Sequence, residues 1–257
     1  MSQKRPSAAD EPHYLVRTLA AEFADGHTLA PHRHSWGQVI YAAGGVMTVW
    51  TEQGSWVAPP GLAVWAPPGV AHAIRFTGAA SLRTLYLRPT LAELSGQSTV
   101  VPVTALLREL ILRAVELRFL DDREAAHRAM AELIAHELRA RPAAAMELPL
   151  PQSAPLRRIA EYLVGAMEDR SGHGALARRF GIGERTLERG FAAETGLTLG
   201  QWRRQARFLN ALRRLGGGAA VKQAALEAGY LSSSAFIAAF RAVFHTTPGR
   251  YFQERTG

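Results

Sequence analysis

One residue pattern occurs twice in the last hundred or so residues, and this repeat constrains the fold more than any other feature of the chain. Each copy reads as a short helix, a turn opened by glycine, and a second helix. From the phenylalanine of each copy onward, the spacing of the shared positions is identical. These positions are Ala177, Gly181, Phe191, Thr198 and Trp202 in the first copy, and Ala225, Gly229, Phe240, Thr247 and Tyr251 in the second.

A helix, a turn and a second helix make the helix-turn-helix pattern, whose second helix enters the major groove of DNA. Charge supports this prediction. Residues 1–154 hold 14 Lys+Arg and 14 Asp+Glu, whereas residues 155–257 hold 16 and 8 and carry the whole formal charge of +8. A basic excess confined to the repeat suits a module that binds a polyanion. The alternative is that these arginines only solvate helix faces.

The chain of 257 residues is long enough for two domains, each with its own core. It has no cysteine, which excludes disulfides and thiolate sites. No apolar run approaches the roughly 18–20 residues that a membrane span needs, and the N-terminus lacks the apolar core of a secretion signal. We therefore expect a cytoplasmic protein without a membrane partner.

The chain divides by composition into five segments. Residues 1–13 are expected to be a disordered tail, and residues 14–95 an all-β barrel, because short β-branched and aromatic runs alternate with glycine and proline turns. Residues 96–141 change to helical periodicity and are expected to dimerise. The proline-rich residues 142–154 form the predicted linker, and residues 155–257 the all-α, double helix-turn-helix domain.

The last segment resembles the AraC/XylS family of bacterial transcription regulators over residues 156–252. Three runs carry the resemblance: Leu176-Ala177-x3-Gly181-x-Gly183-x-Arg185-Thr186-Leu187-x-Arg189-x-Phe191, Gly229-Tyr230-x-Ser232-x-Ser234-x-Phe236-x3-Phe240-Arg241, and Thr247-Pro248-x2-Tyr251. The resemblance implies two helix-turn-helix units joined by a long helix from Leu199 to about Leu215. It also implies a double-stranded DNA operator and, for an activator, contact with RNA polymerase. We expect a homodimer through residues 104–140, because both helical segments there carry apolar stripes that the barrel need not fully cover.

The predicted DNA contacts lie on the outward faces of the two recognition helices. Arginine can pair with guanine there and glutamate with cytosine, whereas the second helix offers mainly hydroxyls. Because Ala238 stands where relatives often have a long polar reader, the second unit is expected mainly to contact phosphates. The candidate residues are Gly183, Glu184, Arg185, Thr186, Glu188, Arg189, Ser232, Ser233, Ser234, Arg241 and Arg250. Arg203, Arg204 and Arg207 are either solvated or engaged in ion pairs.

The N-terminal half contains Gly26-x5-His32-x-His34-x3-Gln38-x5-Gly44 and Gly61-x5-Pro67-x-Gly69-x2-His72, which resemble the two motifs of the cupin barrel. In cupin enzymes the matching positions bind a divalent metal. Residues two apart on a strand face the same side, so His32, His34 and Gln38 should point inward together and His72 should face them. Three imidazoles and one oxygen suit Zn²⁺, Ni²⁺ or Fe²⁺.

The same barrel can instead hold a small effector without any metal, because Gln38 replaces the acidic ligand of the cupin motif. The predicted effector pocket consists of His32, His34, Trp36, Gln38, Trp65 and His72. Residues 29–38 and 63–72 also resemble a subgroup of regulators that control adjacent efflux-transporter genes.

These features predict a ligand-responsive, sequence-specific transcription regulator that is not an enzyme. The rival hypothesis is a metal-dependent cupin enzyme fused to a DNA-binding domain. Its support is the complete histidine set, and the missing carboxylate counts against it. A third hypothesis is a nucleoid-type DNA binder without sequence preference.

Overall fold

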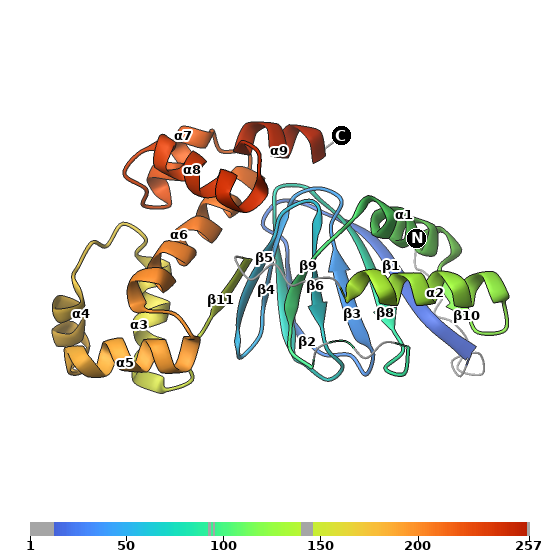
Figure 1. Ribbon diagram of the computed structural model, residues 1–257, viewed down its shortest axis with the longest axis horizontal. Coiled ribbons are helices and arrows are strands. Elements are labelled where there is room, and N and C mark those ends of the chain that lie inside the picture. The colour runs from blue at the N-terminus through green and yellow to red at the C-terminus, as the bar shows by residue number, and fades with distance from the viewer. Residues whose placement is uncertain (1–12, 92–93, 95, 140–145, 256–257) are drawn as a thin grey trace.

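The computed structural model describes residues 13–91, 94, 96–139 and 146–255. A β-rich part is followed by a helical part, as predicted (Figure 1). The strands are β1 (Tyr14–Phe23), β2 (Thr28–His32), β3 (Gly37–Tyr41), β4 (Val46–Trp50), β5 (Gly54–Ala58), β6 (Leu62–Ala66), β7 (His72–Thr77), β8 (Ala80–Leu87), β9 (Thr99–Pro102), β10 (Phe119–Asp121) and β11 (Glu147–Pro149). The helices are α1 (Ala105–Leu117), α2 (Ala125–Leu138), α3 (Ala154–Gly165), α4 (His173–Phe180), α5 (Glu184–Thr195), α6 (Leu199–Gly216), α7 (Val221–Glu227), α8 (Ser233–Phe244) and α9 (Pro248–Arg255).

The strands form two antiparallel sheets. Sheet A has the order β10-β1-β8-β3-β6-β9, and sheet B has the order β11-β5-β4-β7-β2. Strand β3 shows why these sheets form. Every residue of β3 is buried, because both faces of the strand are covered. Ile40 packs in the cluster that includes residues of both sheets, whereas its neighbours Val39 and Tyr41 pack in the cluster that includes residues of α1 and α2. A strand buried on both faces reads as a continuous apolar run rather than an alternating one.

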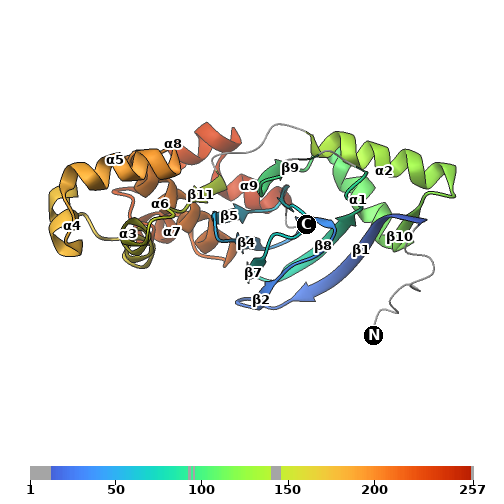
Figure 2. The same ribbon diagram turned by 90° about the horizontal axis from the view of Figure 1, so that it is seen from below.

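Helices α1 and α2 cover the outer face of sheet A (Figure 2). Leu107 and Ile111 of α1 and Ile134 and Leu138 of α2 are buried in the cluster that also holds Val39. Thr104 caps α1 by accepting a hydrogen bond from the backbone N–H of Leu107 at 3.0 Å. Of the segment predicted to be helical over 96–141, the described residues hold α1 and α2 together with the short strands β9 and β10.

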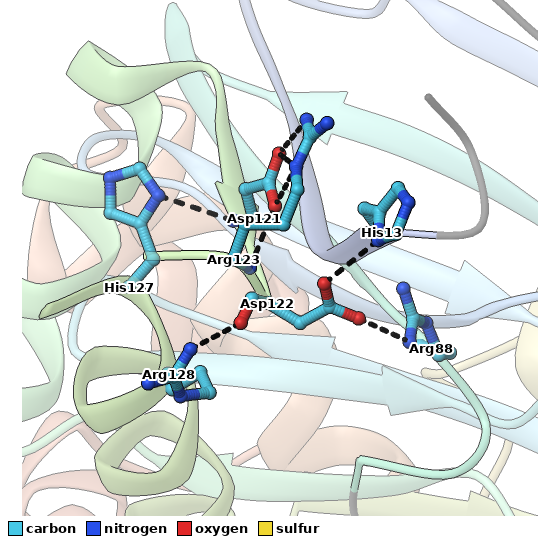
Figure 3. A network of polar contacts seen from close by, with 7 residues as sticks. All are labelled: His13, Arg88, Asp121, Asp122, Arg123, His127 and Arg128. Atoms are coloured by element: carbon cyan, nitrogen blue, oxygen red, sulfur yellow. Dashed lines mark hydrogen bonds and ion pairs between the residues drawn. The ribbon is translucent and has the colours of Figure 1, made fainter. Parts of the chain in front are cut away.

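A polar network ties the start of α2 to the β domain (Figure 3). The carboxylate of Asp122 contacts His13 Nδ1 at 3.1 Å and Arg88 Nη1 at 3.4 Å, and its backbone carbonyl accepts a hydrogen bond from Arg128 of α2. The turn after β10 is thus held from both sides. Residues 1–12 of the predicted tail lie outside the described residues.

The helical part contains two helix-turn-helix units joined by the long helix α6 (Figure 1). The first unit pairs α4 with α5, and the second pairs α7 with α8. Gly181 and Gly229 have φ of 68° and 84°, the left-handed conformation that glycine adopts without strain at a helix end. Leu187 and Phe191 of α5 are fully buried, as are the phenylalanines at positions 236 and 240 of α8, so these positions form the core as expected.

Helix α6 also packs against sheet B, and the core runs continuously from one part into the other. The indole N–H of Trp202 donates to the carbonyl of Pro149 in β11 at 2.7 Å, and Arg213 Nε donates to Thr48 Oγ1 in β4 at 3.1 Å. Of the predicted linker, residues 142–145 lie outside the described residues, while residues 147–149 form β11 and pair with β5. The linker prediction missed this strand.

Candidate functional site

Three histidines converge at one end of the β domain. His32 is the last residue of β2, His34 lies in the irregular segment between β2 and β3, and His72 is the first residue of β7. His32 and His72 are cross-strand partners in sheet B. One ring nitrogen from each of the three histidines lies within 4.8 Å of the others. We call these residues, together with Gln38, the histidine cluster.

Backbone carbonyls orient two of these imidazoles. His32 Nδ1 lies 2.7 Å from the carbonyl oxygen of Ala30, and His72 Nδ1 lies 2.9 Å from that of Val70. A carbonyl oxygen only accepts, so each Nδ1 carries the proton and donates it. In a neutral imidazole the other nitrogen, Nε2, then presents a lone pair.

Gln38 enters the cluster from sheet A, and its amide orientation is fixed by Thr84. The Thr84 hydroxyl donates to the carbonyl of Val39 at 2.8 Å and accepts the Gln38 side-chain N–H at 3.1 Å. The amide oxygen Oε1 therefore faces His72 Nε2, at 2.8 Å. Gln38 presents an oxygen acceptor, rather than an N–H donor, to the histidines.

The electrostatics of the cluster favour the neutral forms of His34 and His72. Burial, followed by the charges of His32, His72 and Arg17, lowers the pKa of His34 from 6.5 to about 4. Burial also lowers the pKa of His72, because its charged form loses hydration, and this outweighs the opposing hydrogen bond to Val70. His34 Nε2 is buried without a hydrogen-bond partner among the described residues. These histidines thus offer lone pairs at neutral pH.

The four predicted ligands converge, but not from the single strand that the sequence suggested. We expected His32, His34 and Gln38 to alternate along one strand. Instead, β2 ends at His32 and pairs within sheet B, whereas Gln38 belongs to β3 of sheet A. The chain crosses between the sheets at His34, and this crossing brings the side chains together.

The two tryptophans assigned to the effector pocket lie differently. Trp36 is half-buried near the cluster, with the guanidinium of Arg17 4.1 Å from its ring centroid. Trp65 is the cross-strand partner of Val39 and packs with it under α1 and α2. Its side chain is on the face of sheet A opposite to Gln38, so its assignment to the pocket is wrong.

Three residues of the cluster's surroundings were missed by sequence reasoning: Arg17, Thr84 and Tyr86. Tyr86 is the cross-strand partner of both Gln38 and Arg17, its ring lies edge-on to His34, and Gln38 donates to its hydroxyl at 3.4 Å. The alternation of Thr84 and Tyr86 with the buried Leu85 and Leu87 was the available sign that both face inward.

The predicted DNA contacts of the first unit are all exposed or partly exposed. They lie at the N-terminal end of α5, on the side away from the buried Leu187. Glu188 contacts His173 Nδ1 at 2.7 Å, so this carboxylate has a partner on α4. The predicted DNA contacts of the first unit are Gly183, Glu184, Arg185, Thr186, Glu188 and Arg189.

The second unit presents a smaller and less charged surface. Ser232 caps α8, since its hydroxyl accepts the backbone N–H of Ala235 at 3.2 Å. Ser234 and Arg241 are exposed and Ser233 is half-buried. Arg250, on α9, is also exposed. Helices α5 and α8 lie along the same side of the molecule, as two units that share one DNA face require (Figure 2).

Comparison with known proteins agrees with this arrangement. Residues 14–180 match the family model of the AraC-like ligand binding domain, which covers more than half of the chain, and residues 176–254 match a helix-turn-helix domain. The chain belongs to the AraC family of transcription regulators. It is a DNA-binding regulator with a ligand-binding domain, and its fold is the expected all-β domain followed by an all-α domain.

One relative of this AraC-family chain is the HTH-type transcriptional regulator NimR of Escherichia coli (strain K12). The two are 32% identical over 232 residues, which cover 90% of this chain and 85% of NimR. Among solved structures, ToxT from Vibrio cholerae has a TM-score of 0.41 and 9% identity, covering 94% of this chain and 99% of that one. The DNA-binding domain of AdpA, in complex with a target DNA, has a TM-score of 0.37 and 27% identity, covering 40% of this chain and 93% of that one.

Within the described residues, no helix is both long and apolar enough to cross a membrane.

Proposed function

We propose that this AraC-family regulator reads its operator chiefly through α5, and that an effector at the histidine cluster changes its DNA binding. The observation that carries the proposal is the convergence of three imidazoles and one amide oxygen inside the ligand-binding domain of a DNA-binding chain. Buried polar groups with perturbed pKa values are typical of binding sites. The resemblance of residues 29–38 and 63–72 to one subgroup supports control of an adjacent efflux-transporter gene.

Footprinting on the region upstream of the gene tests this proposal. We expect a protected site whose occupancy changes when candidate effectors are added. Replacing both His32 and His34 by alanine should abolish the response but leave the basal footprint, because the cluster lies outside the DNA-binding helices. A response that survives in this double variant would place the effector site elsewhere.

The first unit can be tested separately. Arg185→Ala and Arg189→Ala should each weaken binding to the protein's selected DNA site by roughly 1–3 kcal/mol and relax base preference, because both arginines are exposed on α5. Competition against scrambled DNA measures this specificity. The control is Arg158→Ala, which removes one exposed charge from α3. If all three variants keep the wild-type specificity ratio, α5 is not the reader.

The cluster also has the donor chemistry of a divalent metal site. With Nδ1 of His72 donating to Val70, its Nε2 lone pair faces the Gln38 oxygen at 2.8 Å, and two acceptors at that distance repel each other. His34 Nε2 is also buried without a hydrogen-bond partner among the described residues, so three polar atoms of the cluster are left unsatisfied. We propose that His32, His34, His72 and Gln38 hold Zn²⁺, Ni²⁺ or Fe²⁺.

Metal titration into chelator-treated protein, followed by calorimetry and thermal unfolding, tests the metal proposal. Zn²⁺ should raise the unfolding temperature of the wild type but not of the His32→Ala/His34→Ala variant. Gln38→Glu should tighten binding, because a carboxylate adds charge to an otherwise neutral ligand set. If metal does not stabilise the wild type, the cluster is a polar effector site instead.

A homodimer remains part of the proposal, formed through α1 and α2. Both helices bury their apolar stripes against sheet A, but Leu106 of α1 and Leu133 of α2 are 50% and 46% exposed. Contact with RNA polymerase follows only if the regulator activates transcription.

A further inference from the structure

A cavity of about 670 Å³ opens between α6 and α8 in the helical part. Phe208 of α6 and Ala239 of α8 contribute to its apolar wall, and Leu231 lies on its lining where α8 begins. Leu231 is 87% exposed, the highest value among the large exposed hydrophobic residues of the described chain. We call this cavity the interunit groove. Neither the metal proposal nor the base contacts of α5 uses it.

All the charged side chains that line the interunit groove are arginines, and they lie beside the neutral Gln201, Gln205 and Tyr230. The lining includes Arg170, Arg204 and Arg207, and it contains no Asp or Glu among the described residues. Arg170 donates to the carbonyl of Gly229, and Arg207 donates to that of Asp169 at 3.0 Å, so both side chains are held in place. A groove with this lining favours an anion that also carries apolar surface.

Repulsion between Arg207 and the neighbouring arginines also favours a bound anion. Burial and the charges of Arg170 and Arg203 lower the pKa of Arg207, and Asp169 only partly opposes them. A bound anion would relieve this repulsion. Arg204 adds a further exposed guanidinium on the same helix.

The position of the groove identifies the anion. The lining includes Leu197, two residues after the end of α5, as well as Ala235 and Ala239 of α8. The groove therefore separates the two recognition helices, which share one side of the molecule (Figure 2). When two such helices enter successive major grooves, the minor groove between them faces the protein, bordered by two sugar–phosphate strands.

We infer that the interunit groove receives the sugar–phosphate backbone at the central minor groove of the operator. In this arrangement the Arg204 guanidinium contacts a phosphate, while Leu231 packs against the apolar face of a deoxyribose. The inference rests on DNA binding by both units. This backbone contact would supply affinity that the serines and alanines of α8 cannot, because it positions the protein on the DNA without reading bases.

The test uses the full-length protein and a DNA site selected from a random 40-base-pair pool by the wild type. Arg204→Ala should weaken binding several-fold on every sequence, and the slope of log K against log salt should become shallower by about one, the loss of one phosphate contact. Leu231→Ser should weaken binding about two- to fivefold without changing the salt slope, because it removes apolar contact only. Arg158→Ala is the matched charge control.

Hydroxyl-radical footprinting on the same DNA locates the contact. We expect the wild type to protect the backbone at the central minor groove, and Arg204→Ala to lose this protection while keeping both flanking ones. Circular dichroism confirms that the variants are folded, which their exposed positions favour. The inference fails, although DNA binding stands, if the wild type protects two flanking regions but leaves the central minor groove unprotected. It also fails if Arg204→Ala and Arg158→Ala bind DNA alike. No selected site at all would instead overturn the proposed function.

A small amphipathic anion is the competing occupant. The probe 8-anilinonaphthalene-1-sulfonate separates the two. Enhanced fluorescence that depends on Arg204, in a protein whose DNA binding is insensitive to the same substitution, would make the groove a small-molecule site and overturn the inference. Displacement of the probe by the selected DNA, but not by NaCl at matched ionic strength, would support it.

Discussion

Asp121 is a buried carboxylate that the fold keeps charged. Hydrogen bonds from the Arg123 side chain, and then from its backbone N–H, lower the pKa of Asp121 from 3.8 to about 2 against the opposing effect of burial. The unfolded chain takes up this proton near pH 4, whereas the folded chain does so only near pH 2. The stabilisation from this group is therefore complete above about pH 4 and is lost as the pH falls toward 2.

Asp121→Asn should lower the unfolding temperature at pH 7, because the amide cannot form the charged contact with Arg123. It should also flatten the fall in unfolding temperature between pH 4 and pH 2. Thermal unfolding across this range measures both effects. Glu116→Gln, on the exposed face of α1, is the control. An acid slope that is equal in the wild type and in Asp121→Asn would show that another group dominates.

Motif spacing found the residues of the histidine cluster but not the groups that orient them. The positions of His32, His34 and His72 are set by the short segments around them, so their spacing can be recognised in the sequence. Thr84 acts on Gln38 across 46 residues, and this contact exists only after β3 and β8 pair. Trp65 was misplaced because a tryptophan in a strand buried on both faces gives no indication of its side.

Helices were predictable where their own periodicity decides them. The two recognition helices carry buried apolar residues four positions apart and turn glycines before them. The long helix predicted from Leu199 to about Leu215 is α6, which runs from Leu199 to Gly216. The strands β10 and β11 have three residues each, too few to show a period. They become strands because β1 and β5 offer edges with unpaired backbone groups.

Helices α1 and α2 supply the surface for a prediction about assembly. Thr104 donates a hydrogen bond to Glu137, so the start of α1 lies beside the last turn of α2. Leu106 and Leu133 lie close in sequence to these two residues and are half-exposed. We expect the double substitution Leu106→Glu/Leu133→Glu to convert a dimer into a monomer, as measured by light scattering at tens of micromolar.

The matched control for this surface is Leu226→Glu, on α7, where leucine is 49% exposed. It introduces the same type of charge at a similar exposure, away from α1 and α2, and should leave the oligomeric state unchanged. A wild type that is already monomeric at these concentrations would contradict dimerisation through this surface. Equal behaviour of the double variant and Leu226→Glu would place the interface elsewhere.

The contact between the two domains could not be predicted from sequence. Proline and alanine over residues 142–154 suggested independent domains, yet the structure packs α6 on sheet B. Arg213 reaches Thr48 across 165 residues and Tyr251 reaches the carbonyl of Pro60 across 191. Contacts at such separations leave no periodic pattern, since each partner fits its own helix or strand equally well without them.

Strand β7 connects the histidine cluster to this interface. His72 is its first residue, and Gly78 directly follows its last. A Cβ at Gly78 would stand 2.2 Å from the backbone oxygen of Gly216 at the end of α6, and a Cβ at Gly216 would stand 2.2 Å from Val46. A ligand that shifts His72 therefore acts on an element that touches the DNA-binding domain directly.

Gly78→Ala should weaken this interface. The substitution places a Cβ against backbone that cannot move aside alone, and it also strains a residue with φ of 78°. Gly26→Ala is a matched control, because Gly26 has φ of 77° and no atom lies within 4 Å of the place that an added Cβ would take. Gly26→Ala should lower the free energy of unfolding only by the cost of the backbone strain, roughly 1–2 kcal/mol. Gly78→Ala should lower it by more, because the added Cβ also clashes, and thermal unfolding measures both losses.

Gly78→Ala should also reduce the effect of cluster ligands on DNA affinity, whereas Gly26→Ala should not. If both variants unfold alike and respond to ligand like the wild type, the close approach of Gly78 and Gly216 does not carry the signal between the domains.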